Sequence, residues 1–315
     1  MSDLKLAIVV PCYNEEAVLR ETTVRLTEVI DQLVEASAVC PHSFILYVSD
    51  GSTDATWSII EELHRTTPYV RGLKLARNSG HQNALMAGLS AGKELADVLV
   101  SIDADLQDDV MAIPEMITRY ADGADIVYGV RRERKSDTWF KRNTALMFYR
   151  VMRFMGIESV YNHADYRLMS RRAVEYLCRF RERNLFLRGI IPLVGYHTAC
   201  VYYNRGKRFA GESKYPFRKM LSFAVNGITS FSVKPIRMFF FLGLMFLLIA
   251  FATFCYVIYS YIRHQAVEGW ASLMLSLWFI GGCIMTGIGV IGEYLGKIYI
   301  EVKDRPRYNV EEELL

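Results

Sequence analysis

Two carboxylates that could hold a metal ion, Asp103 and Asp105, stand two residues apart. They directly follow the apolar run 98–102, which predicts a buried strand. On a turning backbone both side chains can reach one hard divalent cation, because such cations prefer oxygen ligands. The usual partner of a cation held in this way is a diphosphate. The alternative is that these carboxylates only cap the helix that follows.

A second group of polar side chains stands at the ends of two earlier apolar runs. Asp50 precedes a tight turn at Gly51 and can accept hydrogen bonds from a base or ribose. Tyr13 and Glu15 offer a flat ring and a carboxylate for the same task. Asp54 is expected to cap the next helix. The chain contains no GxGxxG and no GxxxxGK[ST] motif, so neither dinucleotide nor P-loop chemistry is indicated.

The elements that must position these residues alternate between strand and helix patterns over about 210 residues. Apolar runs predict strands at 6–10, 44–48, 70–76, 98–102 and 125–130, with helices through about 34 and over 54–64, 81–95 and 113–120. This alternation predicts an α/β fold with a mostly parallel sheet and helices on both faces. Ligands of such sheets bind beyond the carboxyl ends of the strands, where Asp50 and Asp103 stand.

The apolar residues of the chain are concentrated toward its C-terminal end. The 315 residues are 52% hydrophobic, and their mean hydropathy of +0.14 is unusual for a soluble chain. Residues 238–262 and 269–292 are each long and apolar enough to cross a hydrocarbon core of about 30 Å as a helix. We therefore expect two transmembrane helices and no signal peptide. Lys and Arg at the outer ends of this pair place both termini in the cytoplasm.

Two further segments, 139–155 and 215–233, mix apolar and basic residues as amphipathic helices at a membrane surface do. Their alternative is packing on the soluble domain. The 37 Lys and Arg against 34 Asp and Glu give a net charge of +3, too small to indicate nucleic-acid binding. The six cysteines are scattered without a CxxC pair, which indicates neither a disulfide framework nor a zinc site.

Six motifs together resemble glycosyltransferase family 2, and more narrowly the polyisoprenyl-phosphate (bactoprenol) glycosyltransferases of the GtrB-like group. They are Pro11-Cys-Tyr-Asn-Glu15, Asp50-Gly-Ser-Thr-Asp54, Arg77-Asn-Ser-Gly80, Asp103-Ala-Asp-Leu-Gln107, Asp165-Tyr-Arg-Leu-Met169 and Gly211-Glu-Ser-Lys-Tyr215. The resemblance implies a GT-A fold and an inverting, metal-dependent glycosyltransferase. Its donor would be a UDP-sugar and its acceptor undecaprenyl or another polyisoprenyl phosphate, for modification of cell-envelope glycans. Glucose is the first expectation, with aminoarabinose and N-acetylhexosamine donors left open.

The resemblance also assigns roles by position. It gives the nucleotide to Pro11, Tyr13, Glu15, Asp50 and Arg77, and magnesium or manganese to Asp103, Asp105 and Gln107. It gives the role of catalytic carboxylate to Asp165. Cys12 departs from the family pattern, where Val is commoner at this position.

The acceptor chemistry adds a demand for positive charge. A phosphate monoester has a second pKa near 6 and is mostly a dianion at neutral pH, so little proton abstraction is needed. Arginine suits such anions because it donates two parallel hydrogen bonds. Arg131, Arg188 and Lys214 are the candidates for the acceptor phosphate, and Arg167 is the second catalytic candidate. We hypothesise that Asp165 orients Arg167 or a sugar hydroxyl as much as it accepts a proton.

These expectations divide the chain into a GT-A domain (1–212), a juxtamembrane amphipathic segment (213–235), a transmembrane hairpin (236–296) and a cytoplasmic tail (297–315). The resemblance further implies a homo-oligomer in the cytoplasmic membrane, with a tetramer as one form. A processive polysaccharide synthase would use more spans and typically a Gln-x-x-Arg-Trp motif, which the chain lacks. A non-catalytic membrane scaffold would have no need of the carboxylates at Asp103, Asp105 and Asp165.

Overall fold

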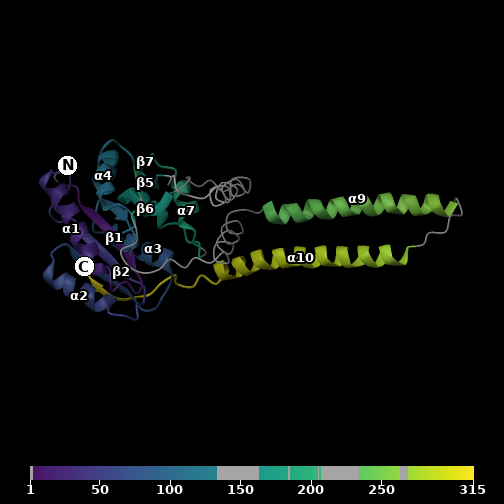
Figure 1. The fold of residues 1–315 in the computed structure, drawn as a ribbon, viewed down its shortest axis with the longest axis horizontal. Helices are drawn as coiled ribbons and strands as arrows, with labels where there is room; N and C mark the ends of the chain where they lie inside the picture. Colours follow the sequence, from purple (N-terminus) through teal and green to yellow (C-terminus); the bar gives the residue numbers. More distant parts are fainter. Residues whose placement is uncertain (1–2, 133–162, 184, 205, 207–233, 263–268) are drawn as a thin grey trace. The chain divides into compact units, whose positions relative to one another are not determined.

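The computed structural model describes residues 3–132, 163–183, 185–204, 206, 234–262 and 269–315. The chain divides into two compact units (Figure 1). The first comprises Met1–Tyr149, Glu158–Pro216 and Arg305–Leu315, and the second comprises Arg150–Ile157 and Phe217–Asp304. The amphipathic segments predicted at 139–155 and 215–233, and the candidate Lys214, lie outside the described residues.

A single sheet forms the centre of the described part of the first unit. Its strands are β1 (Leu6–Cys12), β2 (Phe44–Ser49), β3 (Val70–Leu75), β4 (Val98–Ser101), β5 (Ile126–Arg131), β6 (His163–Ser170), β7 (Thr198–Tyr203) and β8 (Val310–Leu314). They lie in the order β7-β5-β6-β4-β1-β2-β3-β8. Only β6 and β8 run against the others among these strands. The sheet is therefore mostly parallel, as the sequence predicts.

Helices cover both faces of this sheet because its central strands are apolar on both sides. The helical segments are α1 (Leu19–Glu35), α2 (Thr56–Thr66), α3 (His81–Gly92), η1 (Val110–Ala112), α4 (Ile113–Ala121), α6 (Arg171–Leu177), α7 (Leu187–Ile190) and η2 (Ile191–Val194). On one face, Ile8 and Val10 of β1 share a buried core with Leu26 and Ile30 of α1. The opposite face of β1 carries α3.

Helix α3 lies close against the sheet at Gly88. A Cβ atom at this position would collide with the side chains of Val9 and Val48, so only glycine permits the approach. The contact fixes the helix on β1 and β2, and with it the position of the first helical residue, His81.

The C-terminal residues complete the sheet. The sequence predicts 297–315 as a tail, but Val310–Leu314 form β8 and pair antiparallel with β3. The indole Nε1 of Trp57 donates a hydrogen bond to Glu312 Oε2 over 3.2 Å. The side chain of Leu314 lies against Gly72 on the same edge of the sheet. Exposed Glu311 and Glu313 alternate with half-buried Val310, Glu312 and Leu314, so one face of the strand is acidic and exposed and the other is half-buried.

The described part of the second unit consists of two long helices, α9 (Lys234–Ile262) and α10 (Trp270–Val302), which lie side by side (Figure 1). The rings of Phe246 and Phe279 meet edge to face, with centroids 5.5 Å apart. Within the described residues, one segment, Phe279–Val302, is long and apolar enough to span a membrane, and none of it is buried. The predicted second span, over 238–262, falls within α9 and stays a prediction.

Candidate functional site

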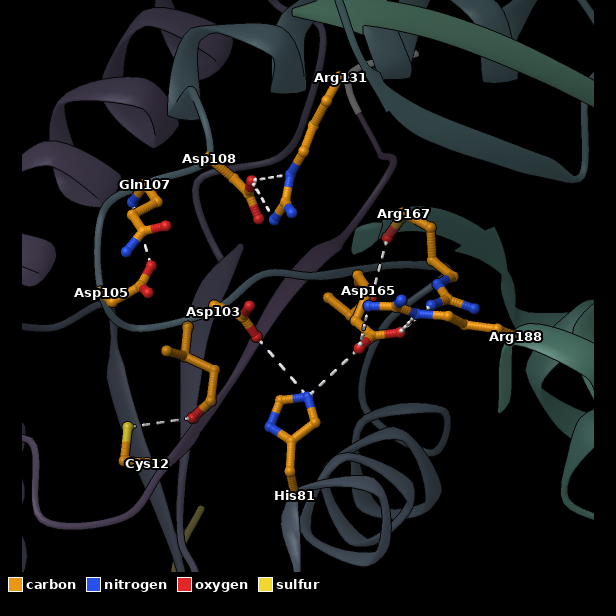
Figure 2. A network of polar contacts seen from close by, with 12 residues as sticks. Cys12, His81, Asp103, Asp105, Gln107, Asp108, Arg131, Asp165, Arg167 and Arg188 are labelled. Atoms are coloured by element: carbon orange, nitrogen blue, oxygen red, sulfur yellow. Dashed lines mark hydrogen bonds and ion pairs between the residues drawn. The ribbon is translucent and has the colours of Figure 1, made fainter. Parts of the chain in front are cut away.

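The carboxyl edge of the sheet brings three titratable side chains together (Figure 2). Asp103 follows β4, Asp165 lies on the neighbouring β6, and His81 begins α3. The Nε2 atom of His81 lies 3.6 Å from Oδ1 of Asp103 and 3.8 Å from Oδ2 of Asp165. Ser101 ties the two strands together here, because its hydroxyl donates to the backbone carbonyl of Asp165 over 2.7 Å. The predicted metal carboxylate and the predicted catalytic carboxylate therefore share one site.

Two arginines hold the Asp165 carboxylate. Arg167 shares a face of β6 with Asp165, because side chains alternate along a strand, and its Nη2 donates to Oδ1 over 2.7 Å. Arg188 of α7 donates from Nε to Oδ1 and from Nη2 to Oδ2, both over 3.2 Å. Arg167 is fully buried, whereas Arg188 keeps 34% of its side-chain surface exposed. Arg188 is therefore the more accessible of the two guanidinium groups, and Arg167 contacts Asp165 from within the core.

The hypothesis that Asp165 orients Arg167 or a sugar hydroxyl stays a prediction. In the structure Arg167 is wholly buried and donates to Asp165 Oδ1, so its guanidinium contacts the carboxylate from within the core. The strand alternation that buries Arg167 also turns Tyr166 and Leu168 into the core on the opposite face.

The two carboxylates of the site have opposite electrostatic surroundings. Burial alone would raise the pKa of Asp165, but the charges of Arg167 and Arg188 outweigh it and hold that pKa well below its usual range. Withdrawal from solvent, together with the charges of Asp165 and other nearby carboxylates, raises the pKa of Asp103, whereas His81 lowers it. The net result is a pKa of about 6. A bound cation would relieve this repulsion at Asp103, whereas Asp165 is already compensated.

The loop after β4 carries the remaining metal candidates. Asp105 Oδ1 accepts a hydrogen bond from the backbone N of Gln107 over 3.1 Å, and Leu106 between them has a positive φ of 55°. The hydroxyl of Thr22 on α1 holds the loop by donating to the carbonyl of Ala104 over 2.9 Å. No group of three or more His, Cys, Asp or Glu side chains is placed to hold a metal within the described ranges. Two carboxylates and an amide fit a cation that takes its other oxygens from a diphosphate and water.

The helical turn that follows Asp103 and Asp105 is capped by Asp109 and not by either of these two carboxylates. Asp109 accepts a hydrogen bond from the backbone N of Met111 over 3.0 Å at the start of η1. Asp103 and Asp105 stand further upstream, before this cap.

Arg131, predicted for the acceptor phosphate, is engaged elsewhere. Its Nη2 and Nε donate to Oδ1 of Asp108 over 2.8 and 3.1 Å, and the Tyr203 hydroxyl donates to the same oxygen over 2.6 Å. The side chain of Asp108 is 1% exposed. The hydrogen bonds to Asp108 therefore connect the loop after β4 to β5 and β7. The sequence does not predict a role for Asp108 or Tyr203 in this connection.

Asp50 organises the loop that follows β3. Only 3% of Asp50 is exposed, and its two carboxylate oxygens accept hydrogen bonds from the backbone N atoms of Ser79 (2.7 Å) and Gly80 (2.9 Å). A Cβ atom at Gly51, whose φ is +62°, would collide with the backbone of Arg77. The Asp50 turn therefore sets the position of the exposed Arg77 beside the site, and a contact of Asp50 with a nucleoside stays a prediction.

The loop after β1 carries the other nucleotide candidates. Pro11 is buried, Glu15 is half-buried and Tyr13 is 47% exposed, so the Tyr13 ring is available to stack. The backbone N of Glu15 donates to the Thr56 hydroxyl over 2.9 Å, which joins this loop to α2. Asp54 accepts from the backbone N of Thr56 over 3.0 Å, but it stands one residue before Ala55, which occupies the N-cap position of α2 in place of the predicted Asp54.

His81 is the site residue that sequence reasoning misses. The sequence does predict a helix beginning at His81, directly after a strand-end loop. A histidine at the first residue of a helix at the ligand-binding edge of a parallel sheet is the signal that could have found it.

Comparison with known proteins gives matches over the whole chain. Residues 7–178 match the family described as Glycosyl transferase family 2, and residues 234–298 match the GtrB C-terminal hairpin. The uncharacterized glycosyltransferase YkoT of Bacillus subtilis (strain 168) is 54% identical over 98% of this chain and 92% of its own length. The bactoprenol glucosyl transferase of Shigella phage SfII is 40% identical over 98% of both chains.

A solved structure also matches at low identity. It is glucosyl-3-phosphoglycerate synthase from Mycobacterium tuberculosis in complex with Mn2+, UDP and phosphoglyceric acid. It is 17% identical, has a TM-score of 0.46, and the match covers 72% of this chain and 76% of that chain.

The family match begins in β1 and ends just after α6, so it contains every side chain around His81 except Arg188. With this match, the mostly parallel sheet is the GT-A fold that the sequence predicts. Fold, site and similarity over the full length agree: the chain belongs to glycosyl transferase family 2.

Proposed function

We propose that the protein transfers glucose from UDP-glucose to a polyisoprenyl phosphate, such as undecaprenyl phosphate, and releases UDP. The observation that carries the proposal is the 40% identity to a bactoprenol glucosyl transferase over 98% of both chains. Both parts of the chain have their own match, the catalytic family and the C-terminal hairpin, which supports a membrane-bound acceptor. The product would serve the modification of cell-envelope glycans.

On the donor side, Asp103, Asp105 and Gln107 would hold the divalent cation, magnesium or manganese. The cation would neutralise charge that develops on the departing UDP. Tyr13, Glu15 and Arg77 line the neighbouring loops and are our candidates for the nucleotide, with Pro11 and Asp50 shaping those loops.

On the acceptor side, Asp165 and Arg188 would meet the lipid phosphate and the sugar. The nucleophile is mostly a dianion at neutral pH, so the site must offset negative charge rather than create it. Arg188 keeps 34% of its side-chain surface exposed while it donates to Asp165, so its guanidinium could also donate to a phosphate oxygen. Asp165 would orient Arg188, and buried Arg167 would keep Asp165 ionised and in place.

We also propose that the chain crosses the membrane twice, with both termini in the cytoplasm. Strand β8 follows α10 and pairs with β3, so the chain before α9 and the chain after α10 belong to one sheet. Both must then lie on one side of a membrane. If Phe279–Val302 crosses it, a second crossing is needed, and α9 is the candidate. Its 29 residues would extend about 44 Å at 1.5 Å per residue.

A donor screen tests the proposed function. The purified full-length protein is incubated with undecaprenyl phosphate, Mn2+ or Mg2+, and one of four donors: UDP-glucose, UDP-galactose, UDP-N-acetylglucosamine or UDP-aminoarabinose. The lipid product is then identified by its mass. We expect a hexose adduct with UDP-glucose. An adduct formed only from another donor would keep the reaction class and replace the sugar.

The mass of the detergent-solubilised particle in the same preparation tests the predicted homo-oligomer.

A further inference from the structure

We propose that His81 contacts the substrates directly, donating a hydrogen bond from Nε2 to a phosphoryl oxygen between Asp103 and Asp165. This inference rests on the proposed function and adds a residue to its site. The phosphoryl group belongs either to the UDP-sugar or to the lipid phosphate, and the test below separates the two.

The position of the ring carries the inference. Nε2 lies 3.6 Å from Asp103 Oδ1 and 3.8 Å from Asp165 Oδ2, too far from either oxygen for a hydrogen bond. The atom therefore lies between the two carboxylates, within ion-pair distance of both and hydrogen-bonded to neither (Figure 2). With 43% of its side chain exposed, His81 is open to a ligand.

The charges around His81 favour a hydrogen-bond donor at the position of its Nε2 atom, between Asp103 and Asp165. Asp103 would be occupied by the cation of the donor complex, and Asp165 is already paired with Arg167 and Arg188. Nε2 then lies between the proposed cation site, where the donor diphosphate would bind, and Arg188, where the acceptor phosphate would bind. An N–H group placed at such a point stabilises negative charge at little cost in reorganisation.

The backbone that carries His81 is held on three sides, so the ring is preorganised. Asp50 fixes the preceding residue through the backbone N of Gly80, at 2.9 Å. The contact at Gly88 seats α3 on the sheet. The side chain of Gln82 accepts a hydrogen bond from the backbone N of Leu187 over 3.1 Å. This last bond joins the start of α3 to α7, the helix that carries Arg188.

The test compares His81→Ala and His81→Gln with wild type, using the full-length protein, UDP-glucose, undecaprenyl phosphate and Mn2+. Glutamine places its side-chain N–H at nearly the reach of histidine Nε2. We expect His81→Ala to lower kcat/KM by about 10- to 100-fold, the range for a hydrogen bond to a charged group. His81→Gln should recover activity to within about fivefold of wild type. As a control, His42→Ala removes an exposed histidine that is not part of the site and should leave kcat/KM unchanged.

Two further readouts identify the phosphoryl group. If His81 binds the donor, His81→Ala raises the KM for UDP-glucose and slows the hydrolysis of UDP-glucose by water, which is measured as UDP released in the absence of lipid. If His81 binds the acceptor, His81→Ala raises the KM for the lipid and leaves the hydrolysis of UDP-glucose by water unchanged. The concentration of Mn2+ that gives half-maximal activity should not move in either case.

Three results overturn the inference alone while wild type remains active. These are wild-type activity in His81→Ala, failure of His81→Gln to recover activity, or a large change in the Mn2+ requirement, which would make His81 a metal ligand. A wild-type protein that transfers no sugar to the lipid overturns the proposed function and this inference together.

Discussion

At the scale of single residues, the surroundings of Asp165 favour an orienting role over that of a base. Arg167 and Arg188 hold its pKa well below the usual range, although burial opposes them. A carboxylate with a depressed pKa is a weak proton acceptor. The lipid phosphate needs little deprotonation in any case. Asp165 is thus best understood as an anchor that aligns Arg188, with buried Arg167 behind it.

Arg188 should therefore matter most for binding of the lipid. Arg188→Ala removes the half-buried guanidinium that we propose meets the acceptor, and we expect the KM for undecaprenyl phosphate to rise about 10- to 100-fold. Arg188→Lys keeps the charge without the two-pronged geometry and should fall between the alanine variant and wild type. The measurement is steady-state kinetics with varied lipid at saturating UDP-glucose. An unchanged KM for lipid in Arg188→Ala would remove Arg188 from the acceptor site.

The same ion pair should make stability depend on pH. Because the pKa of Asp165 is lowered in the folded chain, its stabilising contribution is complete above the unfolded pKa of about 4. It is lost as pH falls through the native pKa. The difference in thermal midpoint between wild type and Asp165→Asn, which cannot titrate, should thus be larger at pH 7 than at pH 3. An equal difference at both values would mean that the Asp165 side chain stabilises through packing rather than charge.

Single residues also show where sequence reasoning stops. Asp103 and Asp165 can be named from motifs, but their proximity depends on β6 pairing antiparallel with β4. His81 and Asp108 directly follow two of the motifs, but only the folded chain shows that His81 lies beside Asp103 and Asp165 and that Asp108 pairs with Arg131.

At the scale of elements, the predicted and the missed strands differ in burial. Strands β1, β2, β4 and β5 are largely apolar runs and β3 is interrupted by Arg71 and Lys74, and the boundaries of all five fall within two residues of prediction. Strand β6 places Asp165 and Arg167 in its middle, and β7 alternates buried and exposed residues at the sheet edge. Strand β8, with three glutamates in five residues, has the composition of a solvated tail. Each of these becomes a strand through its partners rather than its own hydrophobicity.

The C-terminal strand should contribute measurably to the stability of the catalytic unit. Leu314 lies half-buried against Gly72, so Leu314→Ala should cost about 1–2 kcal/mol, less than a fully buried leucine. The thermal midpoint in detergent should fall by about 2–5 °C.

Leu315 provides the matched control for this variant. It follows the end of β8 and is 48% exposed, so Leu315→Ala should leave the midpoint unchanged. Equal effects of the two substitutions would show that β8 does not pack on β3 in solution.

At the scale of the whole molecule, the sheet links the two ends of the chain. Because β8 and β1 share one sheet, we propose that both termini lie on one side of a membrane that the second unit crosses. The two-span prediction from hydropathy and this topological argument are independent of each other. They agree on an even number of crossings.

Protease access to the termini tests this directly. A short cleavable tag before Met1 and another after Leu315 should both be digested in inside-out vesicles and both be protected in right-side-out vesicles. Digestion of only one tag in either preparation would mean a single crossing. The sheet would then have to form without β8.

The central claim is sugar transfer to a lipid phosphate at the Asp103–His81–Asp165 site. Its most direct test is the mass of undecaprenyl phosphate after incubation with UDP-glucose, Mn2+ and either wild type or Asp165→Asn. Wild type should yield a species heavier by one hexose. Asp165→Asn should form it about 100-fold more slowly, because the acceptor is misplaced, while its affinity for UDP is retained. A wild-type protein that binds UDP but yields no hexose adduct, or an equal rate from Asp165→Asn, would contradict this account.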